Sequence, residues 1–141
     1  MVIASAPPAS SSETRQRMQM VARRDTPCEL RVRRILFAGG LRYRIDTEPV
    51  RAVRRKADIV FPRHRLAIFI DGCFWHDCPR HRERPVANAD WWGAKLERNR
   101  RRDSETNRLL REAGWTVLRY WEHEDPREVV AEIRRWLSAS A

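Results

Sequence analysis

A short stretch at residues 70–81, IDGCFWHDCPRH, holds most of the side chains in this chain that could do chemistry. Cys73, Cys78 and His81 supply two thiols and an imidazole within nine residues. These ligand types favour zinc, held in the closed four-ligand arrangement of a structural site. The fourth ligand stays open among three histidines, which are His64, His76 and His123. The alternative is two buried free cysteines with exposed histidines.

Two aspartates at strand ends suggest a second metal. Asp58 interrupts the apolar run KADIVF, and Asp71 ends the run LAIFID. A tight PRHR turn between the runs would let both carboxylates reach the same end of a sheet. Hard oxygen ligands facing a cationic surface are what a Mg²⁺ site for phosphodiester hydrolysis requires. The alternative is a pair of aspartates that only balance nearby arginines.

A long helix expected at about residues 90–113 brings polar groups into an apolar face. The residues that share this face by helical spacing are Trp92, Leu96, Asn99, Asp103 and Leu110. A buried Asp103 needs a partner, and His76 would suit, since an imidazole held at one nitrogen can act as a general base through the other. Asp103 could equally pair with an arginine of residues 98–102. Three arginines are expected to face phosphates, with a solvated helix face as the alternative, and they are Arg98, Arg101 and Arg102.

Two adjacent aromatic residues, Phe74 and Trp75, lie inside the proposed zinc loop. Apolar side chains on a rigid platform can enter a base step and unstack it, so we expect a DNA wedge here, joined by Trp92. The competing interpretation is that these rings cap the edge of the core, and it is stronger for Trp92.

Charge and composition indicate a polyanionic partner. The chain of 141 residues has 29 basic and 19 acidic side chains, a net charge of +10, and only two lysines, Lys56 and Lys95. Arginine is the fork-shaped donor for phosphates and guanine edges, so nucleic acid is favoured. No segment approaches a membrane-spanning length. Three cysteines without a secretory signal predict reduced thiols and a cytoplasmic protein.

The element pattern predicts one α/β domain. Residues 1–13 are Ala/Pro/Ser-rich and are expected to be a disordered tail, followed by one domain over 14–141 that includes a basic arm at 14–25. A first helix should begin after Thr26 and end at Gly39. Three strands (YRI, ADIVF, LAIFIDG), the long helix and a strand (WTVLRYW) follow. The last helix is expected to be amphipathic, with an apolar side made of Val129, Val130, Ile133, Trp136 and Leu137. This order favours a mixed central sheet flanked by helices.

Three segments together closely resemble the very short patch repair (Vsr) endonucleases: DIVF-x4-LAIFIDGCFWHDCPRH, WW-x2-K-x3-N-x3-D and GWTVLRYWEHE. The likeness covers roughly residues 14–137. It implies a variant of the restriction-endonuclease-like PD-(D/E)XK fold with a structural zinc. It also implies Mg²⁺-dependent nicking of duplex DNA on the 5′ side of the thymine in T:G mismatches, which arise when 5-methylcytosine deaminates.

The resemblance also implies roles for single residues. Asp58 would hold Mg²⁺ with the main-chain oxygen of Ile70, His76 would activate water, and Asp103 would orient His76. Glu29 would reach the metal shell through water. The implied zinc ligands are Cys73, Cys78, His81 and His123. The implied wedge is Phe74, Trp75 and Trp92.

One departure concerns Asp71, which stands where the best-known branch of the family has histidine. Asp71 could instead add a carboxylate to the magnesium site. The expected protein is a monomeric bacterial enzyme acting in the nucleoid on mismatched duplex DNA, with other mismatch-repair proteins as further candidate partners. The alternatives are a related restriction or defence nuclease on matched DNA, and a non-catalytic zinc-stabilised DNA-binding module.

Overall fold

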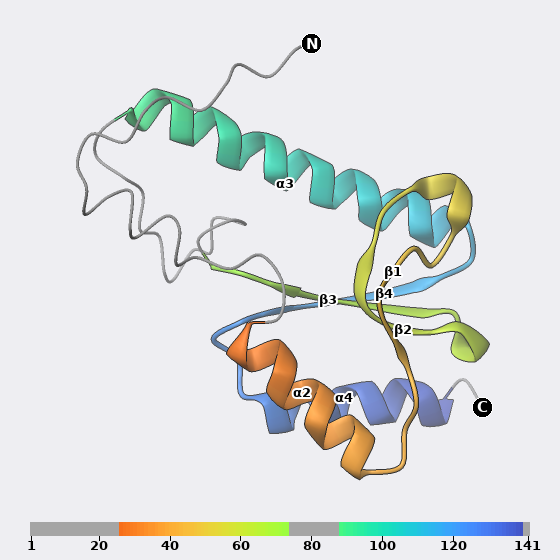
Figure 1. The fold of residues 1–141 in the computed structure, drawn as a ribbon. Helices are drawn as coiled ribbons and strands as arrows, with labels where there is room; N and C mark the ends of the chain where they lie inside the picture. The colour runs from red at the N-terminus through yellow and green to blue at the C-terminus, as the bar shows by residue number, and fades with distance from the viewer. Residues whose placement is uncertain (1–25, 74–87, 140–141) are drawn as a thin grey trace.

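The computed structural model describes residues 26–73 and 88–139, and its centre is a four-stranded sheet (Figure 1). The strands are β1 (Arg44–Thr47), β2 (Ala57–Phe61), β3 (Leu66–Asp71) and β4 (Thr116–Trp121), in that spatial order. β1, β2 and β3 pair antiparallel, whereas β3 and β4 run parallel. The sheet is therefore mixed, as predicted.

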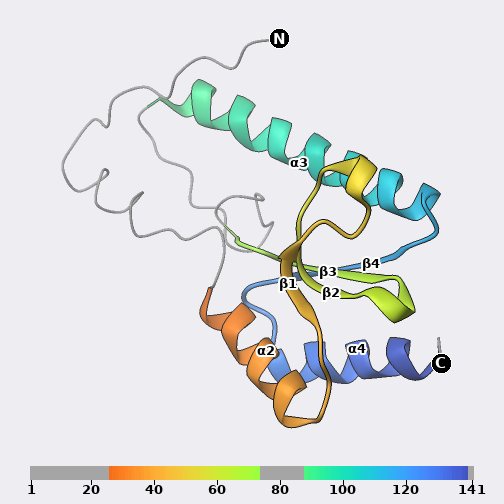
Figure 2. The ribbon, with the colours of Figure 1, turned by 45° about the vertical axis from the view of Figure 1, so that its right-hand side comes forward.

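Helices cover both faces of the sheet. Helix α3 (Ala89–Glu112) lies along one face, and α2 (Pro27–Ala38) and α4 (Pro126–Ala139) lie side by side on the other (Figures 1 and 2). Two single-turn 3-10 helices, η1 (Arg51–Val53) and η2 (Pro62–His64), flank β2. None of the described helices is both long and apolar enough to cross a membrane.

The local signals explain where helix α2 begins and ends. Thr26 caps the N-terminus, its Oγ1 accepting the Glu29 amide at 3.3 Å, and Pro27 fills the first turn. Gly39 ends the helix, and Gly40 adopts a φ of +87° that favours glycine. The predicted boundaries of α2 are confirmed.

Two apolar clusters hold the layers together. The larger one joins the inner sides of α2 and α4 to the sheet, and its fully buried members include Val32, Ile68 and Ile133. The smaller one lies under α3, around Phe69 and Leu110. One expectation was wrong: Trp136, placed on the apolar side of α4, is 43 % exposed. Successive helix residues turn by about 100°, which leaves Trp136 at the edge of the arc formed by Val129, Val130, Ile133 and Leu137.

Candidate active site

The beginning of β2 and the end of β3 bring Asp58 and Ile70 together. The last regular pair of the β2–β3 ladder is Ile59 with Ile68, and beyond it Asp58 Oδ2 accepts the Ile70 amide at 2.7 Å. The N–H and C=O of one strand residue point to the same side, so the Ile70 carbonyl also faces β2. The carboxylate and the main-chain oxygen named for magnesium therefore belong to the same strand junction.

The surroundings of Asp58 disfavour its negative charge. Burial raises the pKa of the Asp58 carboxyl from 3.8 to about 7, the Ile70 amide opposes this rise, and the negative charges of Glu29 and Asp71 add to it. Arg119 lowers the pKa only as a more distant charge. No side-chain cation among the described residues bonds to Asp58, so a divalent ion would supply the compensation that this carboxylate lacks.

Asp71, at the end of β3, has a different environment. The Arg119 guanidinium donates through Nη1 to both oxygens of Asp71, at 2.8 and 3.1 Å. Asp71 is buried, at 8 % exposure, and its charge is balanced by this ion pair. The suggestion that Asp71 adds a carboxylate to the magnesium site therefore finds no support in the structure, because its oxygens already bind an arginine.

Asp103 approaches the same arginine from helix α3. Asp103 Oδ1 lies 3.7 Å from Arg119 Nη1, and Asn107, one turn further along, accepts from Arg119 Nε at 2.6 Å. His76, the predicted partner of Asp103, lies outside the described residues. Sequence reasoning missed Arg119, although a charged residue inside the apolar strand TVLRYW signals a buried partner.

Glu29 is almost fully buried, at 2 % exposure, in the first turn of α2. Its carboxylate forms an ion pair with Arg33, one turn along the same helix. It also lies close enough to Asp58 to raise the pKa of that carboxyl. The structure thus places Glu29 near the proposed metal carboxylate.

Two of the four predicted zinc ligands lie beside each other. Cys73 Sγ is 3.4 Å from His123 Nδ1, just past the ends of the parallel strands β3 and β4. Glu122 fixes this pairing, because its amide donates to the Asp71 carbonyl and its Oε1 accepts the Cys73 amide, both at 3.0 Å. Cys28 is not part of this pair and packs in the larger core cluster.

Of the remaining candidate zinc ligands, two lie outside the described residues and one lies far from Cys73. Cys78 and His81 lie outside the described residues, and within the described ranges no three His, Cys, Asp or Glu side chains form a metal-binding group. His64 is excluded as the fourth ligand, because it lies in η2, before β3 begins, whereas Cys73 follows the end of β3. Six residues of strand separate them by about 20 Å.

The predicted DNA-contacting residues fall into three groups. Phe74 and Trp75 lie outside the described residues. Trp92 is 6 % exposed and packs edge-on against Trp91, with ring centroids 4.8 Å apart, which favours the core interpretation for this residue over an exposed wedge. The arginines expected at phosphates remain on the outer part of α3: Arg98 is half-buried, and Arg101 and Arg102 are exposed.

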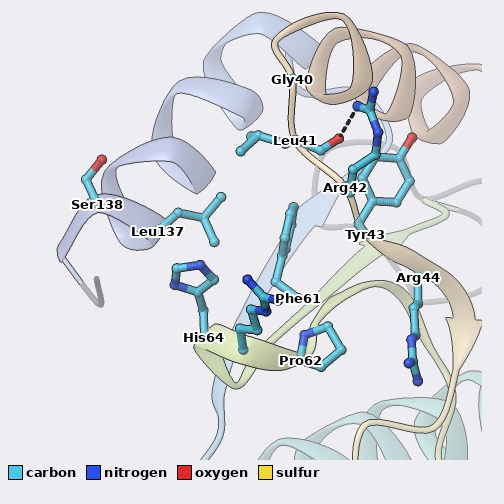
Figure 3. A pocket seen from close by; sticks show the side chains of 11 residues that line it. Gly40, Leu41, Arg42, Tyr43, Arg44, Phe61, Pro62, His64, Leu137 and Ser138 are labelled. Atoms are coloured by element: carbon cyan, nitrogen blue, oxygen red, sulfur yellow. Dashed lines mark hydrogen bonds between the residues drawn. The ribbon is translucent and has the colours of Figure 1, made fainter.

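A hollow lies at the other end of the sheet (Figure 3). Its volume is about 890 Å³, and it opens between the β2–β3 turn, the end of α4 and the segment after α2. Tyr43, Phe61 and Leu137 are among its lining side chains, and Arg42 donates to the Leu41 carbonyl at its rim. No carboxylate lines this hollow, so it offers no ligands for a hard metal.

Comparisons with known protein sequences find related DNA endonucleases. The family model described as DNA mismatch endonuclease Vsr matches residues 9–82. The type II nicking enzyme V.NaeI of Lentzea aerocolonigenes is 45 % identical over 129 residues, covering 89 % of this chain and 78 % of the relative. The nicking enzyme V.XorIIP of Xanthomonas oryzae is 36 % identical, covering 93 % and 96 %. The DNA mismatch endonuclease Vsr of Escherichia coli K12 is 34 % identical, covering 74 % and 66 %.

These matches reach across the strand junction with Asp58 and Ile70 and most of the domain around it. They are incompatible with a non-catalytic DNA-binding module, since the relatives are enzymes by name. The chain belongs to the Vsr family of DNA endonucleases.

Proposed function

We propose that this endonuclease nicks duplex DNA on the 5′ side of the thymine in T:G mismatches left by deamination of 5-methylcytosine. The family description and the Escherichia coli relative carry the word mismatch in their names, and the relatives at higher identity are named nicking enzymes. The fold would be a restriction-endonuclease-like variant, which accords with the mixed sheet between helices.

The main support for the proposal is the environment of the Asp58 carboxylate. This carboxylate is enclosed beside a strand junction, has only a backbone donor, and has a pKa raised to about 7 by burial and by neighbouring negative charge. A purely structural aspartate in such a place would be expected to bind a cationic side chain, as Asp71 does with Arg119. The residues present therefore fit a divalent cation.

We assign Asp58 and the main-chain oxygen of Ile70 to Mg²⁺. When bound, Mg²⁺ supplies charge neutralisation for the scissile phosphate and lowers the pKa of a water. In this assignment His76 would take the proton from the attacking water, Asp103 would orient His76, and Glu29 would hold water next to the metal. Glu29 also contributes negative charge beside the site.

A structural zinc would stiffen the chain beyond β3, held by Cys73, Cys78, His81 and His123. Zinc–sulfur and zinc–nitrogen bonds at a tetrahedral angle place the two ligand atoms about 3.5 Å apart. The observed 3.4 Å between Cys73 Sγ and His123 Nδ1 matches that requirement. The donor set thus fits zinc, and Phe74 and Trp75 would be presented to DNA from this rigid segment.

The remaining partners follow from the same assignment. Arg98, Arg101 and Arg102 would contact phosphates along the helix that also carries Asp103. The protein would act as a monomer, since a single mismatch has no two-fold symmetry to match. Other mismatch-repair proteins are further candidate partners.

A nicking assay tests this proposal directly. Two duplexes identical except for one T:G or T:A pair are incubated with the protein, with and without Mg²⁺, and zinc is measured on the same sample. We expect one nick, on the 5′ side of the mismatched thymine, only with Mg²⁺, and one zinc per chain. Equal cleavage of both duplexes would contradict the repair role and favour the alternative, a nuclease on matched DNA.

A further inference from the structure

Arg119 in β4 connects three elements through one guanidinium group. Nη1 donates to both oxygens of Asp71 on β3, at 2.8 and 3.1 Å, and lies 3.7 Å from Asp103 Oδ1 on α3. Nε donates to Asn107 Oδ1, also on α3, at 2.6 Å. The group is largely buried, since 18 % of the Arg119 side chain is exposed.

The guanidinium plane is also held from the sheet side. Its carbon lies 4.1 Å from the centre of the Phe69 ring, two residues before Asp71 on the same strand. Stacking on an aromatic ring together with several in-plane donors is a geometry that arginine can adopt and lysine cannot. Two side chains of β3, Phe69 and Asp71, therefore restrain the orientation of the group without any contribution from α3.

The two contacts to α3 are one helical turn apart. Residues 103 and 107 lie on the same face of the helix at a spacing of four, so one ion pair and one hydrogen bond from the same rigid group restrain both the position and the rotation of α3 about its axis. The same part of α3 is also fixed from the side of η1, because Arg55 Nε donates to Thr106 Oγ1 at 3.2 Å. A helix held in this way keeps Asp103 at a constant position relative to the end of β3.

We propose that Arg119 is a positioning residue for the nicking reaction: it fixes Asp103 relative to the Asp58–Ile70 junction by binding the end of β3 and helix α3 at once. This inference rests on the proposed roles of Asp58 and Asp103. Asp71 then serves as the anchor of Arg119 on β3 rather than as a metal ligand. The rival explanation is that Arg119 only neutralises a buried aspartate and has no bearing on the reaction.

Three variants separate these explanations. In Arg119→Met, misplacement of Asp103 should lower kcat about 100-fold, while KM and the Kd for duplex DNA change by about threefold or less. Arg119→Lys keeps the charge and one donor group, and should recover about a tenth of the wild-type kcat. The double variant Asp71→Asn/Arg119→Met removes both charges. It should therefore regain most of the fall in the midpoint of denaturant unfolding that Arg119→Met causes, but keep the low kcat.

A readout independent of activity accompanies the kinetics. Amide hydrogen exchange along α3 near residues 103–107 should increase in Arg119→Met and stay increased in the double variant, because only the charge imbalance has been repaired. The matched control is Arg108→Met, which removes an exposed arginine of the same helix, paired with Glu112 at 3.3 Å, and should leave kcat and exchange unchanged.

Recovery of kcat in the double variant, or wild-type kcat in Arg119→Met, would overturn the inference and leave Arg119 as a simple charge partner. Failure of the proposed function looks different. If the wild type nicks T:G and T:A duplexes equally, the mismatch role is lost, and the same comparison of variants is made on the matched duplex.

Discussion

The two ends of the central sheet have opposite chemistry. At the end where β2 begins and β3 and β4 finish, Asp58, Asp71 and Glu122 gather with Cys73 and His123. At the other end, the hollow around Tyr43 and Phe61 is lined by arginines and apolar side chains, with no carboxylate. This hollow therefore lacks the hard ligands that the proposed Mg²⁺ site needs, and the candidate ligands lie at the acidic end.

Within the acidic end, two aspartates that lie thirteen residues apart in the sequence have different environments. Asp71 binds the Arg119 guanidinium through both oxygens, whereas Asp58 binds one backbone amide and has a pKa raised to about 7. A carboxylate with an arginine partner is already compensated, and one without such a partner is available to a cation from solution. The difference supports Asp58 rather than Asp71 as the proposed ligand of Mg²⁺.

The largest effect should come from Asp58→Asn. Loss of the proposed Mg²⁺ ligand should lower kcat by about 1,000-fold or more, equivalent to about 4 kcal/mol of barrier. Binding of a T:G duplex, measured by fluorescence anisotropy without Mg²⁺, should remain within about threefold of wild type. The control Asp46→Asn changes an aspartate of β1 and should nick normally. An Asp58→Asn protein that nicks at the wild-type rate would remove the metal assignment.

The zinc site should give the next largest effect. In Cys73→Ser, zinc content should fall from one per chain toward zero, because a hydroxyl is a poor substitute for a thiolate. At a free zinc concentration 100 times the dissociation constant, losing the metal costs about 2.7 kcal/mol of unfolding free energy. Elemental analysis and urea unfolding measure both quantities. Cys28→Ser is the matched control, and unchanged zinc in Cys73→Ser would contradict the assignment.

A smaller expected effect is the contribution of Asp58 to the pH dependence of the free energy of unfolding. The pKa of Asp58 is about 7 in the folded protein and near 3.8 when unfolded, so the folded state holds the proton more tightly and its stability falls as pH rises from about 4 to 7. The full shift corresponds to at most about 4 kcal/mol, and partial solvent exposure reduces this to about 1–2 kcal/mol.

Urea unfolding of wild type and Asp58→Asn in Mg²⁺-free, zinc-replete buffer isolates this contribution. The wild type should become less stable than the variant between pH 5 and pH 8, and adding Mg²⁺ at pH 8 should narrow the gap. A gap independent of pH would show that Asp58 keeps its ordinary pKa.

The smallest expected effect is on the affinity for duplex DNA, and it compares arginines of α3 with arginines that line the hollow. Arg101→Gln/Arg102→Gln should weaken duplex binding about three- to tenfold at moderate salt and reduce the slope of log K against log salt by about one to two. Arg44→Gln/Arg63→Gln removes the same charge from the hollow and should leave the slope unchanged. Equal losses from both pairs would mean that DNA affinity follows net charge alone.

Local patterns were sufficient to predict most of the elements. The Thr26–Pro27 start and Gly39 end of α2, the apolar runs of β2 and β3 and the long helix before Gly114 all appear near the expected residues. Trp136 was misplaced, because helical spacing gives the face of a residue but not how far the neighbouring layer extends over it.

The sequence by itself determined the residue types of the site, the order of the elements and the family, because these depend on local spacing and motif. Only the tertiary structure decided the pairings. It placed the Ile70 amide on Asp58, gave Asp71 and Asn107 to Arg119, and brought Cys73 to His123 rather than to the distant His64. These contacts join residues between 12 and 50 positions apart, and such distances close through sheet register and layer packing, which no local pattern encodes.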